Sequence, residues 1–326
     1  MSLSKERIFI TGGRGFIGSY ILLELSNHYP VVSLDYAETH PELEDLAPSS
    51  VKFIKADLND TDSWEGFLKD CSAVFNFIGG GGNKRALQDP LWAYQAYVSG
   101  TRLLLEKSKK FGIKHVYLVS TIGVYPEQKG LLSEDTAPSP ANFYSALKLV
   151  SEYILKESGL AGTIMRFSNI YGFTPLDPIQ EGGALGNFLN SAIKGEDIVV
   201  YGKGDEAIDY LHIEDLKEMV LRLNKERINQ KGVETFNIGS GKPIPVYKIA
   251  ETVLDVARKM FDCPSRIKYK KIVSPSASGG NRQLSISNIV RLTDYTPQVS
   301  LHEGIEGMFR GYFNVSREEK GIGLLR

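Results

Sequence analysis

Hydrophobic residues in the first half of the chain occur in short runs that are typical of buried strands. Most of the gaps between these runs can hold a helix. The runs are Ile8–Ile10, Val31–Leu34, Val51–Ile54, Ala73–Ile78, Val116–Ser120 and Thr163–Arg166. Strands that alternate with helices in this way are typical of a doubly wound parallel sheet, so the pattern predicts an α/β fold.

The pattern becomes irregular after about residue 172. Glycine- and proline-rich pieces there separate three predicted helices, at Leu185–Lys194, Ile213–Asn224 and Val246–Phe261. We expect residues 1–172 to form the sheet domain, with return segments near 205–240, and residues 173–326 to form mainly a smaller C-terminal lobe.

Composition and charge exclude several classes of protein. The 326 residues are 42% hydrophobic and 24% charged, and the formal net charge is -1. This charge gives no basic surface for a nucleic acid, so we do not expect a nucleic-acid partner. No apolar segment reaches the roughly 18 to 20 residues that span a bilayer, so we do not expect a membrane protein. Residues 1–7 contain no apolar signal-peptide region, so we expect a cytoplasmic protein. Cys71 and Cys263 lie far apart without a Cys/His cluster, which argues against a disulfide framework and a metal site.

A glycine-rich turn follows the first predicted strand. Gly13, Gly15 and Gly18 form a G-x-G-x-x-G motif that opens a predicted helix. Glycines at these positions permit a tight turn and the close approach of a pyrophosphate to the start of the helix. Asp35 ends the second strand, where a carboxylate accepts hydrogen bonds from a ribose and repels a 2′-phosphate. The motif thus predicts a Rossmann-like dinucleotide site that favours NAD over NADP.

A second group of candidate residues follows the fifth strand. Tyr144 and Lys148 are four residues apart in a predicted helix, so their side chains share one face. To accept a proton near neutrality, a phenol needs its pKa lowered by about 3 units, and a nearby ammonium stabilises the phenolate. Thr121 ends the preceding strand, where its hydroxyl can hydrogen-bond a reacting oxygen. We therefore predict that Thr121, Tyr144 and Lys148 are catalytic.

These motifs, in this order, resemble those of the extended short-chain dehydrogenases/reductases, in the branch of NAD-dependent sugar-nucleotide epimerases and dehydratases. The resemblance covers nearly the whole chain. The segments that carry it are Thr11–Gly18, Asp57–Leu58, Val119–Tyr125, Tyr144–Lys148, Arg166–Gly172, Asp209–Leu216 and Phe236–Gly241.

The resemblance implies an NAD-dependent enzyme with a nucleotide-sugar substrate. Lys148 is implied to anchor the nicotinamide ribose, and Asn169 to face the substrate diphosphate. The residues expected to contact NAD are Gly12, Gly15, Phe16, Ile17, Gly18, Asp35, Asp57, Leu58 and Lys148. The helices near Leu91–Lys107 and Tyr144–Lys156 are apolar around most of their circumference, which, like the family, indicates a homodimer.

The chain departs from the family at positions that bear on the reaction. Ile122–Gly123 stand where dehydratases carry an acidic residue or pair, so we do not expect 4,6-dehydration. Ile208 replaces an arginine that commonly binds a phosphate, which removes a charge-assisted contact. We consider Arg282 as a substitute cation in the substrate site.

Other departures surround the expected nicotinamide region. Tyr97 stands where the family often has Asn, and Asn76–Gly79 replaces the usual His-Leu-Ala-Ala. The run Gly79–Gly82 either gives room for a bulky substrate or forms a flexible loop, and both interpretations stay open.

Three functions are compatible with these residues. The first is an NAD-dependent epimerase that acts on a nucleotide-activated sugar through a transient keto intermediate. The second is an NAD-dependent reductase or dehydrogenase of a related keto or hydroxy sugar. The third is a catalytically inactive nucleotide-sensing protein, against which the presence of Thr121, Tyr144 and Lys148 argues.

Overall fold

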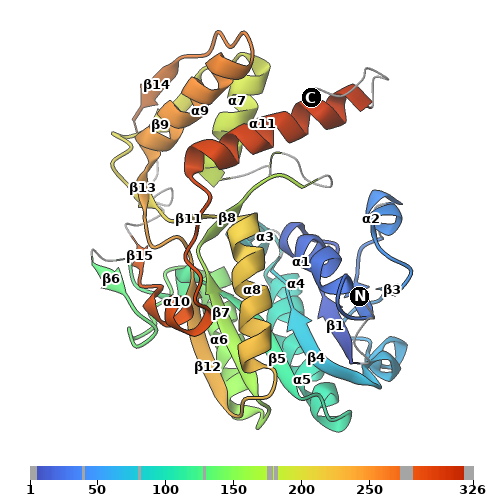
Figure 1. The fold of residues 1–326 in the computed structure, drawn as a ribbon. Coiled ribbons are helices and arrows are strands. Elements are labelled where there is room, and N and C mark those ends of the chain that lie inside the picture. The colour runs from blue at the N-terminus through green and yellow to red at the C-terminus, as the bar shows by residue number, and fades with distance from the viewer. Residues whose placement is uncertain are drawn as a thin grey trace.

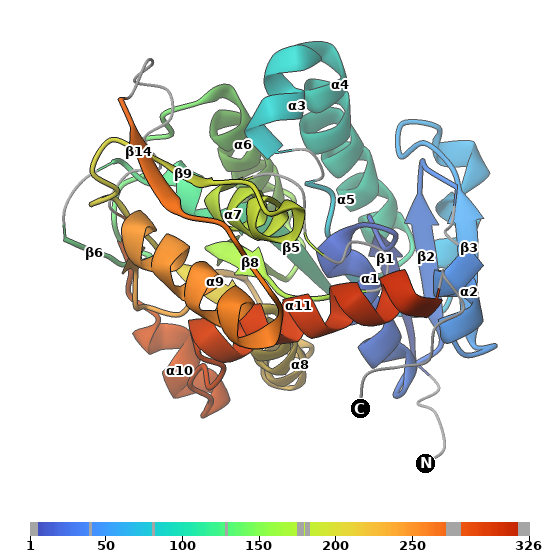
Figure 2. The same ribbon diagram turned by 90° about the horizontal axis from the view of Figure 1, so that it is seen from above.

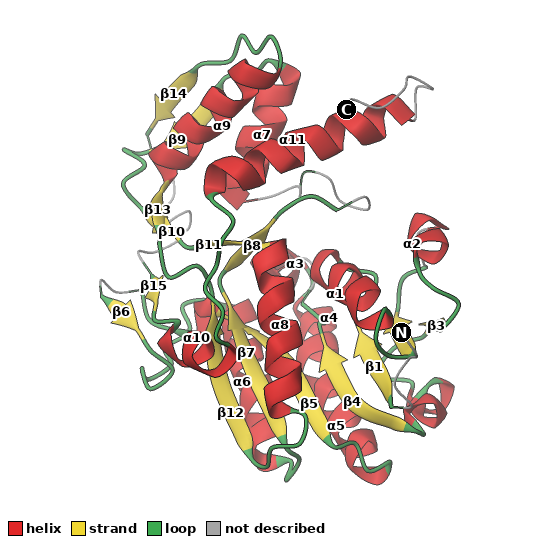
Figure 3. Cartoon of the chain, viewed as in Figure 1, coloured by secondary structure: helices red, strands yellow, loops and turns green. Residues whose placement is uncertain are grey.

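Seven parallel strands form the main sheet of the computed structural model (Figures 1 and 3), which describes residues 6–38, 41–79, 82–127, 130–174, 179, 183–271 and 282–318. The strand order is β12-β7-β5-β4-β1-β2-β3. Their bounds are β1 (Arg7–Thr11), β2 (Val31–Asp35), β3 (Val51–Lys55), β4 (Cys71–Asn76), β5 (His115–Thr121), β7 (Gly162–Phe167) and β12 (Val233–Ile238). The six predicted strands and the doubly wound fold are confirmed, and β12, in the expected return segment, adds the edge strand beside β7.

Helices cover both faces of this sheet (Figure 2). One core contains side chains of α1 (Phe16–Ser26) and α8 (Ile213–Arg227), and the other contains those of α5 (Gly100–Lys110) and α6 (Phe143–Glu157). Along β1 the side chains alternate: Ile8 and Ile10 enter the first core and Phe9 enters the second. Because both faces are buried, the central strands are continuous apolar runs rather than alternating ones, whereas the edge strands β3 and β12 are partly exposed.

A third core lies in the C-terminal lobe, above the carboxyl ends of the strands in the view of Figure 1. It is built from α7 (Gly183–Lys194), α9 (Val246–Met260) and α11 (Leu301–Glu318), with β9 (Ile198–Tyr201) paired in parallel to β14 (Ile267–Lys270). The helices predicted at 185–194, 213–224 and 246–261 correspond to α7, α8 and α9. Of these, α8 packs on the main sheet, as its place in the return segment implies.

Shorter elements complete the chain. The helix predicted near 91–107 is divided by a π-helical turn, η3, which separates α4 from α5. The remaining elements are α2 (Pro41–Leu46), α3 (Gly82–Gln88), α4 (Pro90–Tyr94), α10 (Ser287–Thr293), β6 (Leu131–Leu132), β8 (Asn169–Tyr171), β10 (Ala207–Ile208), β11 (Tyr210–His212), β13 (Ile244–Pro245), β15 (Gln283–Leu284), the turn η3 (Gln95–Ser99) and the 3-10 helices η1 (Thr61–Ser63), η2 (Glu65–Leu68) and η4 (Ile122–Val124). Within the described ranges, no helix has the length and apolar character needed to cross a membrane.

Candidate active site

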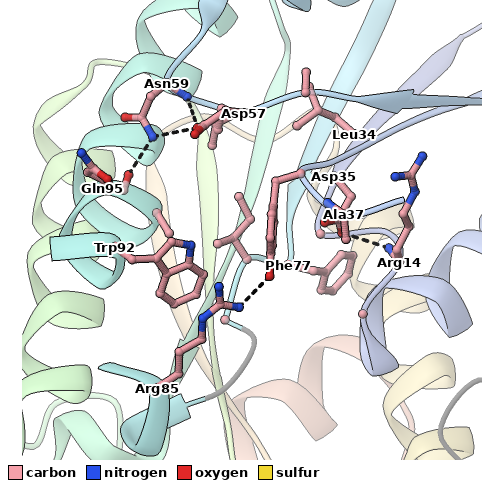
Figure 4. A pocket seen from close by; sticks show the side chains of 18 residues that line it. Arg14, Leu34, Asp35, Ala37, Asp57, Asn59, Phe77, Arg85, Trp92 and Gln95 are labelled. Atoms are coloured by element: carbon pink, nitrogen blue, oxygen red, sulfur yellow. Dashed lines mark hydrogen bonds between the residues drawn. The ribbon is translucent and has the colours of Figure 1, made fainter. Parts of the chain in front are cut away.

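A cavity of about 380 Å³ opens where β1 and β4 lie side by side (Figure 4). The chain continues from β1 to β2 on one side and from β4 to β5 on the other, so the strand order reverses at this point. Ligands of doubly wound sheets bind in the crevice at such a reversal. Gly12 and Gly15 line the cavity from the first turn, and Phe77, Ile78 and Gly79 line it from the end of β4.

The glycine turn leaves no space for side chains at two of its positions. A Cβ atom on Gly18 would lie 2.0 Å from the carbonyl oxygen of Gly12, and one on Gly13 would lie 2.2 Å from Ser33 Oγ. Gly12 has a φ of +72°, a conformation that glycine adopts readily. The next helix, α1, begins at Phe16 and Ile17 without a side-chain cap or an acidic residue in its first turn. Its first N–H groups are therefore suited to a phosphate, which fits a dinucleotide pyrophosphate.

The predicted ribose and adenine residues lie at the other end of the cavity. Asp35 Oδ2 accepts a hydrogen bond from Arg14 N at 3.3 Å, and its Oδ1 accepts one from Ala37 N at 3.1 Å. Asp57 Oδ1 accepts one from Asn59 N at 2.8 Å. These contacts fix both carboxylates at the cavity wall, to which Leu58 also contributes. The structure thus brings Gly12, Gly15, Asp35, Asp57 and Leu58 to one cavity.

An arginine that the sequence pattern does not identify as a site residue also lines this cavity. Arg85 on α3 donates a hydrogen bond from Nη1 to the hydroxyl of Tyr36 at 2.6 Å. Its guanidinium carbon lies 3.5 Å from the ring centre of Trp92 on α4 (Figure 4). This contact joins the segment after β2 to the helices after β4. Because it depends on the packing of distant segments, no local sequence signal predicts it.

Asn76 is buried at the end of β4, directly before the cavity-lining residue Phe77. Its Oδ1 accepts hydrogen bonds from Thr11 Oγ1 at 2.9 Å and from Ile78 N at 3.1 Å. Its Nδ2 donates to Thr101 Oγ1 at 3.2 Å. One buried amide therefore ties β1, the end of β4 and α5 together, at the position where the resembling family usually has histidine.

Tyr144 and Lys148 lie on one face of α6, which points to the carboxyl ends of β4 and β5. The helix begins after Asn142, whose Oδ1 accepts a hydrogen bond from Ser145 N at 2.9 Å. The position of a Cβ atom on Gly79 is 3.5 Å from Lys148 Nζ and 3.7 Å from the Tyr144 hydroxyl. Both groups therefore lie near Gly79, at the edge of the cavity. The rest of the glycine run includes residues 80 and 81, which lie outside the described residues.

Thr121 lies beside the first turn of the same helix. Its Oγ1 accepts a hydrogen bond from Gly123 N at 3.1 Å. A Cβ atom on Gly123 would lie 3.4 Å from Thr121 Oγ1 and only 2.2 Å from the hydroxyl of Ser145, the neighbour of Tyr144. The end of β5 and the start of α6 are thus in contact, and Gly123 has no room for an acidic side chain.

Burial disfavours the charged forms of both predicted catalytic groups. It raises the pKa of Tyr144 to about 12 and lowers the pKa of Lys148 to about 7, while Glu152 has a smaller, raising effect on Lys148. Lys148 Nζ donates to the carbonyl oxygens of Ile78 at 2.5 Å and Val119 at 2.9 Å. A phenolate beside an ammonium offsets both desolvation costs, because each charge stabilises the other.

The predicted substrate residues lie in different surroundings. Asn169, at the start of β8, is exposed, and its Nδ2 donates to the carbonyl oxygen of Asp209 at 3.3 Å. Arg282 is buried and pairs with Glu127 at 3.4 Å, and burial lowers its pKa.

Across the residues that the structure describes, no group of three or more His, Cys, Asp or Glu side chains could hold a metal ion.

A buried polar network fixes the rear of α6 to the sheet. Glu152, fully buried, accepts hydrogen bonds from Arg166 Nε at 2.9 Å, from Arg166 Nη2 at 2.6 Å and from Ser120 Oγ at 2.5 Å. Arg166 Nη1 also donates to the hydroxyl of Tyr125, which donates to Asn237 Oδ1. Ser120, Arg166 and Asn237 are register partners on β5, β7 and β12, so the network spans three adjacent strands.

The fold and the crevice define a Rossmann-type dinucleotide enzyme. Residues 8–239 match the NAD dependent epimerase/dehydratase family, and the chain belongs to this family. The predictions of the family, the fold and NAD as cofactor are thereby confirmed.

Relatives within the family differ in their reactions. The chain is 28% identical to a UDP-glucose 4-epimerase of Bacillus subtilis, over 77% of this chain and 82% of the relative. It is 24% identical to a UDP-N-acetyl-alpha-D-glucosaminuronate decarboxylase of Bacillus cytotoxicus, over 96% of this chain and 100% of the relative. A solved structure of UDP-N-acetylglucosamine 4-epimerase from Methanobrevibacter ruminantium M1, in complex with UDP-N-acetylmuramic acid, superimposes with a TM-score of 0.83 at 24% identity. That match covers 96% of this chain and 99% of the other.

Proposed function

We propose that the protein is an NAD-dependent epimerase that acts on a nucleotide-activated sugar through a transient keto intermediate. The observation that carries the proposal is that the Tyr144 hydroxyl and Lys148 Nζ both lie near Gly79, at the edge of the dinucleotide cavity. The 4-epimerase relative and neighbour support this choice of reaction.

The crevice suits the cofactor at each of its parts. The turn at Gly12–Gly18 would hold the pyrophosphate, and Phe16 and Ile17 begin the helix that faces it. Asp35 would accept hydrogen bonds from the adenosine ribose, while Asp57 and Leu58 would border the adenine. Lys148 would bind the nicotinamide ribose. When bound, NAD supplies reversible hydride acceptance to the reaction.

Three side chains divide the proton chemistry. The Tyr144 phenolate would remove the proton of a sugar hydroxyl, and the Lys148 ammonium would stabilise that phenolate. The Thr121 hydroxyl would hydrogen-bond the reacting oxygen. Reduction of the keto sugar on its other face would return the proton from Tyr144, which leaves the epimer. The cramped backbone at Gly123 leaves no acid there for 4,6-dehydration.

The substrate would lie between the sheet and the C-terminal lobe. We assign NAD binding to residues 1–172 with the segments near 205–240, and substrate binding mainly to residues 173–326. Asn169 would face the substrate diphosphate. Arg282 would supply the cation that Ile208 does not, on condition that Glu127 releases it, because the two are paired.

The assembly would be a homodimer formed through the outer faces of α4 and α6. Leu91 and Tyr94 on α4 are exposed, as are Val150 and Tyr153 on α6, and the two helices contact each other. Burying these apolar side chains against a second copy would stabilise the assembly. Sedimentation equilibrium measures the mass of the assembly directly. The cytoplasmic localisation stays a prediction.

The test begins with the cofactor. Denaturing the purified protein and analysing the supernatant shows whether dinucleotide is released with it. Retained NAD favours epimerisation, whereas an empty site with rapid exchange favours a reductase or dehydrogenase. A thermal-shift series of UDP, dTDP, GDP and CDP sugars then selects the substrate for turnover assays.

The variant Tyr144→Phe should lose turnover by at least about a hundredfold and still bind NAD, because acid–base catalysis typically contributes 10²–10⁴-fold. Tyr269→Phe is the matched control, since it makes the same change at a side chain on β14 that is 56% exposed. Near-normal turnover of Tyr144→Phe on the selected sugar would exclude Tyr144 as the base. NAD binding by the wild type without turnover of any sugar would leave the nucleotide-sensing alternative.

A further inference from the structure

Tyr97 occupies an unusual position behind the proposed catalytic pair. Its side chain is 1% exposed and belongs to the π-helical turn η3, a feature often found at functional sites. The ring is held from two sides: its centroid lies 5.7 Å from that of Trp92 and 5.5 Å from that of Tyr144, both edge-on. Its backbone carbonyl accepts a hydrogen bond from Ser151 Oγ at 2.7 Å, which joins η3 to α6. The ring is therefore rigidly placed.

The Lys148 ammonium lies over this ring, 5.2 Å from its centroid. Two of its donors go to the carbonyl oxygens of Ile78 and Val119 at the ends of β4 and β5. An aromatic face attracts a cation within about 6 Å of its centroid, and more strongly where water is excluded. The carbonyl oxygens and the ring together form a cage around the ammonium.

The other titratable groups that face this ammonium are on α6. Tyr144 lies beside it near Gly79, and Glu152 lies one helical turn further along. The carboxylate of Glu152 is already paired with Arg166, so much of its charge is balanced there. The ring of Tyr97 is the group on η3 that contacts both Lys148 and Tyr144.

We propose that Tyr97 is a positioning residue, whose ring holds the Lys148 side chain beside Tyr144 and stabilises its ammonium form. Its importance for turnover rests on the proposed function, whereas its effect on Lys148 does not. An asparagine, which the resembling family often has here, would offer polar atoms in place of a cation-binding face. At this position, the chain thus has an aromatic ring that attracts a cation in place of an amide that forms hydrogen bonds.

The first experiment measures Lys148 without any substrate. Lysines labelled with ¹³C at the ε carbon are titrated by NMR, and the Lys148 signal is assigned by its loss in Lys148→Met. Tyr97 is replaced by phenylalanine and, in a second protein, by a trifluorinated phenylalanine that keeps the shape of the ring but weakens its negative face. We expect the Lys148 pKa to stay within about 0.2 units in Tyr97→Phe and to fall by about half a unit to one unit in the fluorinated protein.

An equal pKa in the phenylalanine and fluorinated proteins would overturn the proposal. Because these two side chains have nearly the same shape, the comparison does not depend on the stability of a truncated variant. Tyr97→Leu gives a further check and should lower the pKa at least as far as the fluorinated ring.

The second experiment follows turnover of the sugar selected above as a function of pH. Loss of the ammonium weakens stabilisation of the Tyr144 phenolate, so the acidic limb of kcat should move to higher pH in the fluorinated protein and not in Tyr97→Phe. A lowered Lys148 pKa with an unchanged pH profile would refute the positioning role in catalysis. Failure of every protein, wild type included, to turn over any sugar would count against the proposed function and leave the NMR result to decide the contact.

Discussion

Removing the charge of Glu152 tests how strongly the buried network holds the catalytic helix. In Glu152→Gln the side chain keeps its size, but an amide replaces the carboxylate that accepts three hydrogen bonds from Arg166 and Ser120. One end of the new amide is an NH2 group, which cannot accept a hydrogen bond from the guanidinium. Arg166, 2% exposed, would then be a buried cation without its counter-ion.

The size of the effect follows from that burial. Breaking a buried ion pair by removing one partner typically costs about 3–5 kcal/mol, because the remaining charge stays desolvated. Since single domains are stable by about 5–15 kcal/mol, the variant should lose a large part of its free energy of unfolding. Replacing both members, as in Glu152→Gln with Arg166→Met, removes the orphaned charge and should recover part of the loss.

Urea denaturation monitored by circular dichroism measures these free energies. Glu157→Gln is the matched control: it makes the same chemical change on the same helix at an exposed position, and should stay within about 0.5 kcal/mol of the wild type. A loss below about 1 kcal/mol for Glu152→Gln, or a double variant no more stable than Glu152→Gln, would refute the reasoning.

Two further predictions concern the glycine turn and the amino-terminal end of β5. Gly18→Ala would place a methyl group 2.0 Å from the Gly12 carbonyl oxygen, so NAD affinity measured by calorimetry should fall at least about tenfold; Gly66→Ala, where a Cβ has no neighbour within 4 Å, should leave it unchanged. Burial, and to a lesser degree the charge of Arg227, lowers the pKa of His115 to about 4 from an ordinary 6.5. The unfolded chain therefore binds more protons between pH 6.5 and 4, and stability should fall by about 3 kcal/mol as the pH drops through this window. The variant His115→Gln should lack that acid-dependent component in urea titrations, and an unchanged slope would contradict the assignment.

Local sequence patterns predict the main strands and three C-terminal helices, because these segments are short apolar runs or have apolar residues at helical spacing. Five of the six apolar runs lie in buried strands, and the helices at 185–194, 213–224 and 246–261 have regular apolar stripes. The pairing of β12 with β7 depends on contacts between segments far apart in the chain. The sequence predicts only that residues near 205–240 return to the sheet domain, and does not predict which strand they pair with.

The residues of the site likewise include some that local sequence patterns identify and others whose contacts depend on the fold. The glycine turn and the Tyr144–Lys148 spacing are local, so the sequence identifies them. Tyr97 is visible as a departure from the family, but its contact with Lys148 requires the π-helical turn and its packing on α6. Arg85 reaches Tyr36 across the cavity, a contact between segments that no local pattern connects.

The amide of Asn76 makes the hydrogen bonds beside the crevice independent of pH. A histidine in its place could gain or lose a proton between pH 5 and 8 and would exchange a donor for an acceptor as it did so. An amide has no such protonation change, so its links to Thr11, Ile78 and Thr101 persist across that range. These buried links beside the cavity are thus independent of pH in that range, and the proton-dependent chemistry proposed for this end of the sheet is carried by Lys148 and Tyr144.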